Sequence, residues 1–158
     1  MRIFYAIIVA GLVTGTLDIL SAFAGYVPHG ATVTGILKFI ASGLIGPGAL
    51  KGGDAIAVLG LATHYALATA MAATYVGAAL KAPMILSRPW VYGIVYGVLT
   101  YIAMAFIIVP HSGVSGWKLP HGWDIVSGLL AHCLFVGTPI AHFARFYLTS
   151  DTGPKAAA

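Results

Sequence analysis

Long apolar stretches alternate with short polar ones along this chain of 158 residues. Four apolar stretches, at about 3–24, 55–80, 89–109 and 124–148, are long enough to cross roughly 30 Å of hydrocarbon, which takes about 20 helical residues. The pattern predicts an all-α fold: one integral membrane domain over 1–158, built as a four-helix bundle. The polar end, 150–158, is expected to be a flexible tail.

A fifth apolar stretch, at about 33–50, is too short to span a membrane. It carries Lys38 and contains the helix-breaking run Gly46-Pro47-Gly48. Non-helical backbone at membrane depth needs protein or water around it. We therefore expect a short re-entrant or interfacial helix here, with a helix on the outer surface of the bundle as the alternative.

Composition narrows the class of protein. Hydrophobic residues make up 59% of the chain and charged residues 8%, against about 45–50% and about 25% in soluble domains. These values argue against a soluble globular domain, and disorder requires the opposite composition. Because the basic residues form no run, the expected partner is the lipid bilayer and no nucleic acid is expected.

The distribution of Lys and Arg predicts the orientation. With four spans, both termini and the 81–88 loop lie on one side, which carries Arg2, Lys81, Arg88, Arg145 and Lys155. The other side carries Lys38, Lys51 and Lys118. Because basic residues accumulate on the cytoplasmic side, both termini are expected there. Cleavage of a signal peptide after Ala24 is the alternative, and Asp18 within the apolar run argues against it.

The first and third spans resemble one another at an offset of 82 residues, and the second and fourth at an offset of 68. This pattern predicts two similar helical hairpins related by a parallel pseudo-repeat. Gly11 with Gly15, and Gly93 with Gly97, form equivalent GxxxG pairs in the first and third spans. Such pairs allow close helix packing in a membrane.

Five polar residues interrupt the apolar spans at similar depth: Asp18, His64, Thr100, Tyr101 and His132. At about 1.5 Å of rise per residue, they fall roughly 9–13 Å from the same side of the membrane. Polar side chains in hydrocarbon normally face the bundle interior. We therefore expect one buried polar layer.

Three interpretations of this layer are open. It can be a structural hydrogen-bond network that fixes helix register. Alternatively, His64 and His132 can ligate a haem or chlorin, with Asp18 orienting one imidazole. The third interpretation is a proton or small-solute path that includes Asp18. A separate zinc or copper site is a hypothesis for His29, His111 and His121 with the Asp124 carboxylate, although their spacing fits no short metal motif.

Motifs of hydrolytic or group-transfer enzymes are not visible. The sequence contains no Glu, no HExxH, no GxSxG and no phosphate-binding loop. Asp54 and Asp124 stand at predicted helix starts, where Asp54 is expected to cap its helix. We therefore expect a protein without catalytic activity.

Four stretches carry a resemblance to a known group: 11–18 (GLVTGTLD), 36–46 (ILKFIASGLIG), 57–64 (AVLGLATH) and Val109-Pro110. The chain resembles uncharacterised bacterial inner-membrane proteins with four spans and a short apolar segment after the first. The resemblance covers roughly 3–147. It implies a location in the bacterial inner membrane and implies no activity.

The leading functional hypothesis is a non-catalytic accessory or scaffold subunit that packs against a larger membrane protein complex. Small extramembrane loops and small-residue helix faces favour this interpretation. One alternative is a haem- or pigment-binding electron-transfer protein using His64 and His132. A second alternative is a small-solute or proton transporter with Asp18 in the path.

Overall fold

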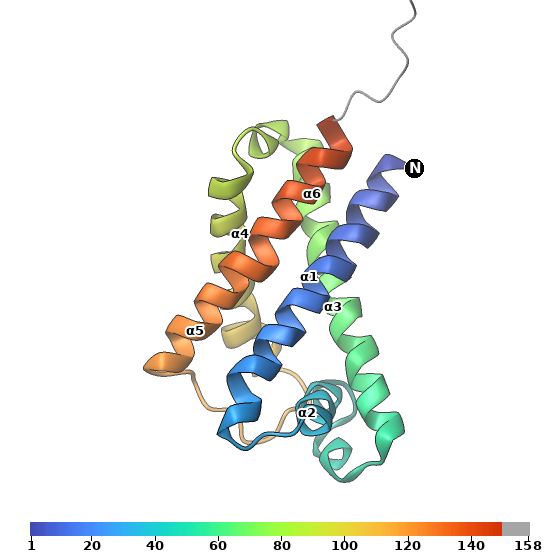
Figure 1. Ribbon diagram of the computed structural model, residues 1–158, viewed down its shortest axis with the longest axis vertical. Coiled ribbons are helices and arrows are strands. Elements are labelled where there is room, and N and C mark those ends of the chain that lie inside the picture. Colours follow the sequence, from blue (N-terminus) through green and yellow to red (C-terminus); the bar gives the residue numbers. More distant parts are fainter. Residues whose placement is uncertain (150–158) are drawn as a thin grey trace, which may run out of the picture.

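The computed structural model describes Met1–Thr149, and all regular secondary structure in this range is helical (Figure 1). The all-α prediction is confirmed. Four helical stretches are long and apolar enough to cross a membrane: Arg2–His29, Asp54–Lys81, Pro89–Ile108 and Trp123–Thr149. They agree with the predicted spans to within a few residues. The predicted tail lies outside the described residues.

Six α-helices form the body of the structure: α1 (Arg2–Tyr26), α2 (Val33–Ile45), α3 (Asp54–Lys81), α4 (Pro89–Ala103), α5 (Trp123–Ala131) and α6 (Thr138–Thr149). Three short 3-10 helices connect them: η1 (Val27–His29), η2 (Pro47–Lys51) and η3 (Pro83–Leu86). Two π-helical turns, η4 (Met104–Ile108) and η5 (His132–Gly137), extend α4 and join α5 to α6. The third long helical stretch therefore ends in a π turn, and the fourth contains one between two α-helices.

Glycines, and not the aspartates that follow them, occupy the N-terminal cap positions of α3 and α5. Asp54 was expected to cap α3, but the cap position is Gly53 and no side chain caps this end. Asp54 instead lies in the first turn, where a negative charge interacts favourably with the helix dipole. Gly122 likewise occupies the cap position of α5, in a left-handed conformation with φ of 54°. Asp124 instead lies in the first turn of α5, exposed to solvent.

The predicted 33–50 segment consists of two elements, because Gly46, with φ of 82°, separates α2 from η2. Figure 1 shows α2 nearly end-on at one end of the bundle, so it crosses the direction of the long helices. It packs against α3, and a Cβ atom on Gly60 of α3 would overlap the Leu37 carbonyl group. The bundle therefore has an α2 end and an opposite, terminus end.

The long helices pack as two pairs, α1 with α3 and α4 with η5 and α6, and α1 also lies along α6. All four GxxxG glycines are buried at these contacts. A Cβ atom on Gly11 would lie 2.7 Å from the Thr69 Cα, and one on Gly15 would lie 2.7 Å from the Tyr65 ring. A Cβ atom on Gly93 would lie 2.7 Å from the Thr138 Cα. A Cβ atom on Gly97 would lie 2.5 Å from the Cα of Cys133.

The packed core fills the terminus end of the bundle. Its buried cluster is built mostly from small side chains: Ala6, Ala10, Ala72, Ala79, Ala141 and Ala144, with Tyr75, Val76, Leu86, Val136 and Ile140. Two tyrosine hydroxyls here are paired, since Tyr96 donates to the Met71 carbonyl oxygen at 2.7 Å and Tyr75 to that of Ile85 at 3.3 Å. Most of the buried apolar side chains therefore lie toward this end of the bundle.

We predict that Gly137→Ala destabilises the protein and that Gly77→Ala does not. A Cβ atom on Gly137 would overlap the Gly93 carbonyl oxygen, whereas one on Gly77 would meet nothing within 4 Å. Overpacking costs about 1–3 kcal/mol, and replacing an unobstructed helical glycine gains about 0.5–1 kcal/mol. Chemical unfolding in detergent micelles, followed by circular dichroism, measures both changes. Equal stability of the two variants would contradict the proposed close packing of α4 and η5.

Candidate functional site

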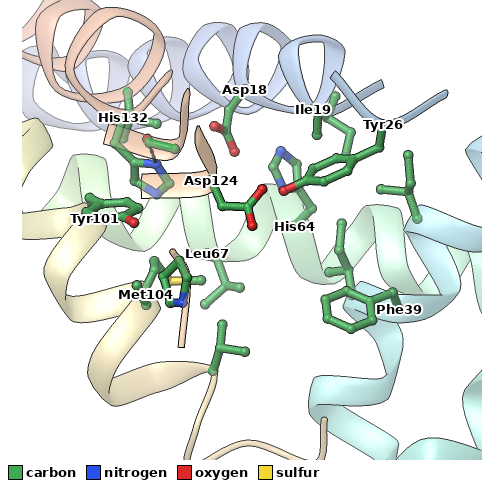
Figure 2. Close-up of a pocket in the computed structure, with 18 of the residues that line it drawn as sticks. Asp18, Ile19, Tyr26, Phe39, His64, Leu67, Tyr101, Met104, Asp124 and His132 are labelled. Carbon is green, nitrogen blue, oxygen red and sulfur yellow. Dashed lines mark hydrogen bonds between the residues drawn. The ribbon is translucent and has the colours of Figure 1, made fainter. Parts of the chain in front are cut away.

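A cavity of about 550 Å³ lies at the α2 end of the bundle. Its walls come from both helix pairs, α1 and α3 on one side and α4, η4, α5 and η5 on the other, with α2 and the 117–121 segment at the end. Figure 2 shows residues of its lining, the labelled ones among them, around one shared space. The volume is that of a small-molecule binding site.

Most of the lining is apolar, and the polar groups are few. Aliphatic and thioether side chains from five helical elements form the walls: Ile19, Ile36, Ile40, Leu67, Met71, Met104 and Val136. Aromatic rings of Tyr26, Phe39, Tyr101 and Trp117 complete the lining. An apolar cavity with a small number of placed polar groups is typical of ligand sites.

Two carboxylates from different helix pairs face this cavity. Asp18 projects from α1 and Asp124 from the first turn of α5, and both point into the space in Figure 2. Within Met1–Thr149, neither side chain forms an ion pair or a hydrogen bond. Lys118 is the third charged residue of the lining. The cavity therefore carries two negative charges and one positive charge.

His64 links α3 to the backbone of α1. Its Nε2 atom lies 2.8 Å from the Gly15 carbonyl oxygen. Because a carbonyl oxygen only accepts hydrogen bonds, Nε2–H donates, and Nδ1 keeps its lone pair in the neutral ring. The missing side chain at Gly15 leaves room for the Tyr65 ring of α3, which a Cβ atom would approach to 2.7 Å. His64 therefore fixes the spacing of the two helices while facing the cavity.

His132 and Tyr101 form a second supported pair. The His132 Nδ1 atom donates to the Gly128 carbonyl oxygen at 2.9 Å, so Nε2 is the free nitrogen. The Tyr101 ring contacts the His132 ring edge-to-face, with centroids 5.6 Å apart. A Cβ atom on Gly128 would lie 2.7 Å from the Tyr101 ring, so only glycine leaves room for it. Both rings are held in place before any ligand binds.

Three buried polar atoms of the cavity lining have no hydrogen-bond partner in the described part of the chain. They are the Tyr101 hydroxyl, the Thr14 Oγ1 atom and the Trp117 Nε1 atom. Tyr101 is only 8% exposed and Thr14 is fully buried. Leaving such a group unpaired costs about 1–3 kcal/mol. Three residues of the cavity wall therefore each hold a buried polar atom that the described protein leaves unpaired.

The 117–121 segment lies across the α2 end of the cavity. All five of its residues contribute to the lining. Gly116 and Gly122, with φ of 69° and 54°, lie immediately outside it in left-handed conformations that favour glycine. Just before it, Gly113 N–H donates to the Gly43 carbonyl oxygen at 2.9 Å, which ties the loop to α2.

The structure brings four of the five residues of the predicted polar layer to this cavity: Asp18, His64, Tyr101 and His132. Thr100 is absent from the lining, because its Oγ1 atom donates to the carbonyl oxygens of its own helix at Tyr96 and Gly97. Sequence analysis did not place Asp124 with this layer: it took the residue for a helix start and for the carboxylate of the hypothetical metal site. It also missed Trp117, which lies in an irregular loop without periodicity.

The three histidines of the hypothetical metal site are not brought together as a ligand set. His29 and His111 each direct Nδ1 to the carbonyl oxygen four residues earlier, at 2.8 and 2.7 Å. His121 lines the cavity instead. Within Met1–Thr149, no group of three or more His, Cys, Asp or Glu residues has the arrangement of a metal site.

Comparison with protein-family models, with curated proteins and with solved structures finds no match to this chain. The function is therefore argued from the cavity alone.

We predict opposite effects of removing two tyrosine hydroxyls. Tyr101→Phe removes an unpartnered buried hydroxyl and is expected to raise stability by about 1 kcal/mol. Tyr96→Phe removes a hydroxyl that donates at 2.7 Å and is expected to lower stability by about 1 kcal/mol. Unfolding midpoints in one detergent compare the two variants directly. A loss of stability in Tyr101→Phe as large as that in Tyr96→Phe would show that this hydroxyl is already paired.

Proposed function

We propose that this chain is a membrane-embedded binding protein for a small, largely apolar molecule that carries a polar group. The observation that carries the proposal is the cavity of about 550 Å³ with unpartnered polar atoms in its wall. Apolar side chains would contact the body of the molecule, and the polar atoms would contact its polar group. The binding step needs no catalytic residue.

The proposal includes a location for the site. We place the chain in the bacterial inner membrane with both termini in the cytoplasm, because the terminus side carries five of the eight Lys and Arg residues. The α2 end and the cavity mouth would then face outward. Four helices of sufficient length and apolarity support membrane insertion.

A duplicated hairpin is part of the same proposal. Two contacts support it: Gly11 packs on Thr69, and Gly93 packs on Gly137, which are equivalent positions at the offsets of 82 and 68. His29 and His111, also equivalent, each direct Nδ1 to the carbonyl oxygen four residues earlier. The cavity would then lie between the two halves, where binding sites of repeat-built membrane proteins often lie.

A haem- or pigment-binding protein is the second candidate. It is favoured by one observation: His64 and His132 line the same cavity, and each has one nitrogen bonded to a carbonyl oxygen and the other free. Iron-ligating histidines are commonly fixed in this way. We predict a Soret or chlorin absorption band in protein purified from its own membrane if this candidate holds. A spectrum without either band would exclude it.

Two further hypotheses stay predictions. A small-solute or proton transporter would use the same cavity with Asp18 in the path. An accessory subunit would cover the apolar side of α4, where Val91, Val95 and Leu99 are exposed, yet lipid explains that exposure equally. Co-migration with a larger complex in mild detergent is the expected result for an accessory subunit.

We predict that the protein binds one equivalent of (3,3-dimethylbutyl)benzene, a small hydrocarbon, and that Leu67→Trp abolishes binding. Leu67 lines the cavity, so the larger side chain fills it. Leu80→Trp is the matched control, because Leu80 lies on the same helix, half-exposed and outside the cavity. Titration calorimetry, corrected for protein-free micelles, measures binding. Equal heats for wild type and Leu67→Trp would contradict the proposal.

A further inference from the structure

The charge of the cavity indicates which class of polar group its ligand carries. Asp18, Asp124 and Lys118 are its charged lining residues, which gives a formal charge of −1 with neutral histidines. Neither carboxylate has an ion-pair partner within Met1–Thr149. Asp18 is partly buried beside apolar walls, which replace part of its hydration, whereas Asp124 lies exposed at the edge of the cavity. A single positive charge on the ligand would offset this cost.

The aromatic side chains of the lining also favour a positively charged ligand. Tyr26, Phe39 and Tyr101 surround the space that the two carboxylates face (Figure 2), and Trp117 lines it from the loop. The face of an aromatic ring attracts a cation within about 6 Å of its centroid. These rings also offer apolar surface to the remainder of a ligand. Carboxylates and aromatic rings together therefore favour an organic cation over a neutral or anionic molecule.

We propose that the ligand is a monovalent organic cation with an apolar body, such as a quaternary or protonated amine. This inference rests on the proposed binding function and names the substrate class of the same site. Asp18 from α1 and Asp124 from α5 would share the cation between the two helix pairs. The buried Tyr101 hydroxyl, without a partner, adds an oxygen with free lone pairs.

A bare metal ion does not fit this cavity. Metal cations are held by several oxygen, nitrogen or sulfur ligands at short distance. Within the described residues, no three such side chains are grouped, and most of the lining is carbon. An organic cation needs only the charge of one carboxylate and contact with the walls. The site therefore selects for charge combined with apolar surface.

The test is a pair of probes that differ in one atom. Phenethyltrimethylammonium and (3,3-dimethylbutyl)benzene have the same shape, with a charged nitrogen in the first where the second has carbon. We expect the wild-type protein to bind the ammonium about tenfold or more tightly than the hydrocarbon in calorimetric titration, a factor that cation–π contact and charge pairing readily supply. In Asp18→Asn and Asp124→Asn, the preference is expected to fall while the hydrocarbon still binds.

Asp54→Asn is the matched control, since Asp54 is exposed at the start of α3 and lies outside the cavity. It should keep the wild-type preference. Equal affinity for the two probes would overturn the inference and leave the proposed binding function standing. Binding of neither probe would overturn both. A preference for the ammonium that survives in both aspartate variants would overturn the assignment to these carboxylates.

Discussion

Polar groups buried away from water must be hydrogen-bonded, and this constraint separates the two ends of the bundle. At the terminus end, the hydroxyls of Tyr75 and Tyr96 donate to carbonyl oxygens across helix contacts. At the α2 end, Tyr101 and Trp117 are buried with nothing to donate to. Thr138 is the one unpartnered buried group of the described chain away from the cavity lining. An apolar bundle tolerates such groups where a ligand or water can reach them.

Close backbone packing makes the cavity possible. Glycines at 11, 15, 93 and 97 let neighbouring helices approach so closely that no side chain would fit at these positions. The π turns η4 and η5 then contribute Met104, Ala105, His132 and Val136 to the cavity wall. Such turns insert a residue into a helix and often occur at functional sites. Close contacts at the glycines, some of them with η5 itself, and the irregular turns η4 and η5 therefore border the space between the helix pairs.

Sequence analysis predicted the four long apolar helices well, because runs of about 20 apolar residues favour long helices of this kind. Helical rise also predicted that Asp18, His64, Tyr101 and His132 lie at one level, and they line one cavity. The same argument failed for Thr100, which is buried but donates its hydroxyl within its own helix, to Tyr96 and Gly97. Position along a helix alone does not determine which buried side chain reaches the cavity.

Asp124 and Trp117 could not be predicted from the pattern. Their approach to the cavity depends on the path of the 109–122 loop and on the cap at Gly122, which are tertiary features without periodicity. The break at Gly46 was visible in the sequence as Gly-Pro-Gly, but the crossing direction of α2 was not. That direction follows from the contact of α2 with α3 at Gly60.

The unpartnered indole of Trp117 offers the most direct test of the account. In protein labelled with nitrogen-15, each of the three tryptophans gives a separate indole N–H resonance in the NMR spectrum. Addition of phenethyltrimethylammonium is expected to shift the Trp117 resonance, because the probe enters the cavity beside it, and to leave that of Trp90, at the terminus end, unchanged. A Trp117 resonance that does not move at saturating probe, or that moves only as much as that of Trp90, would contradict the account.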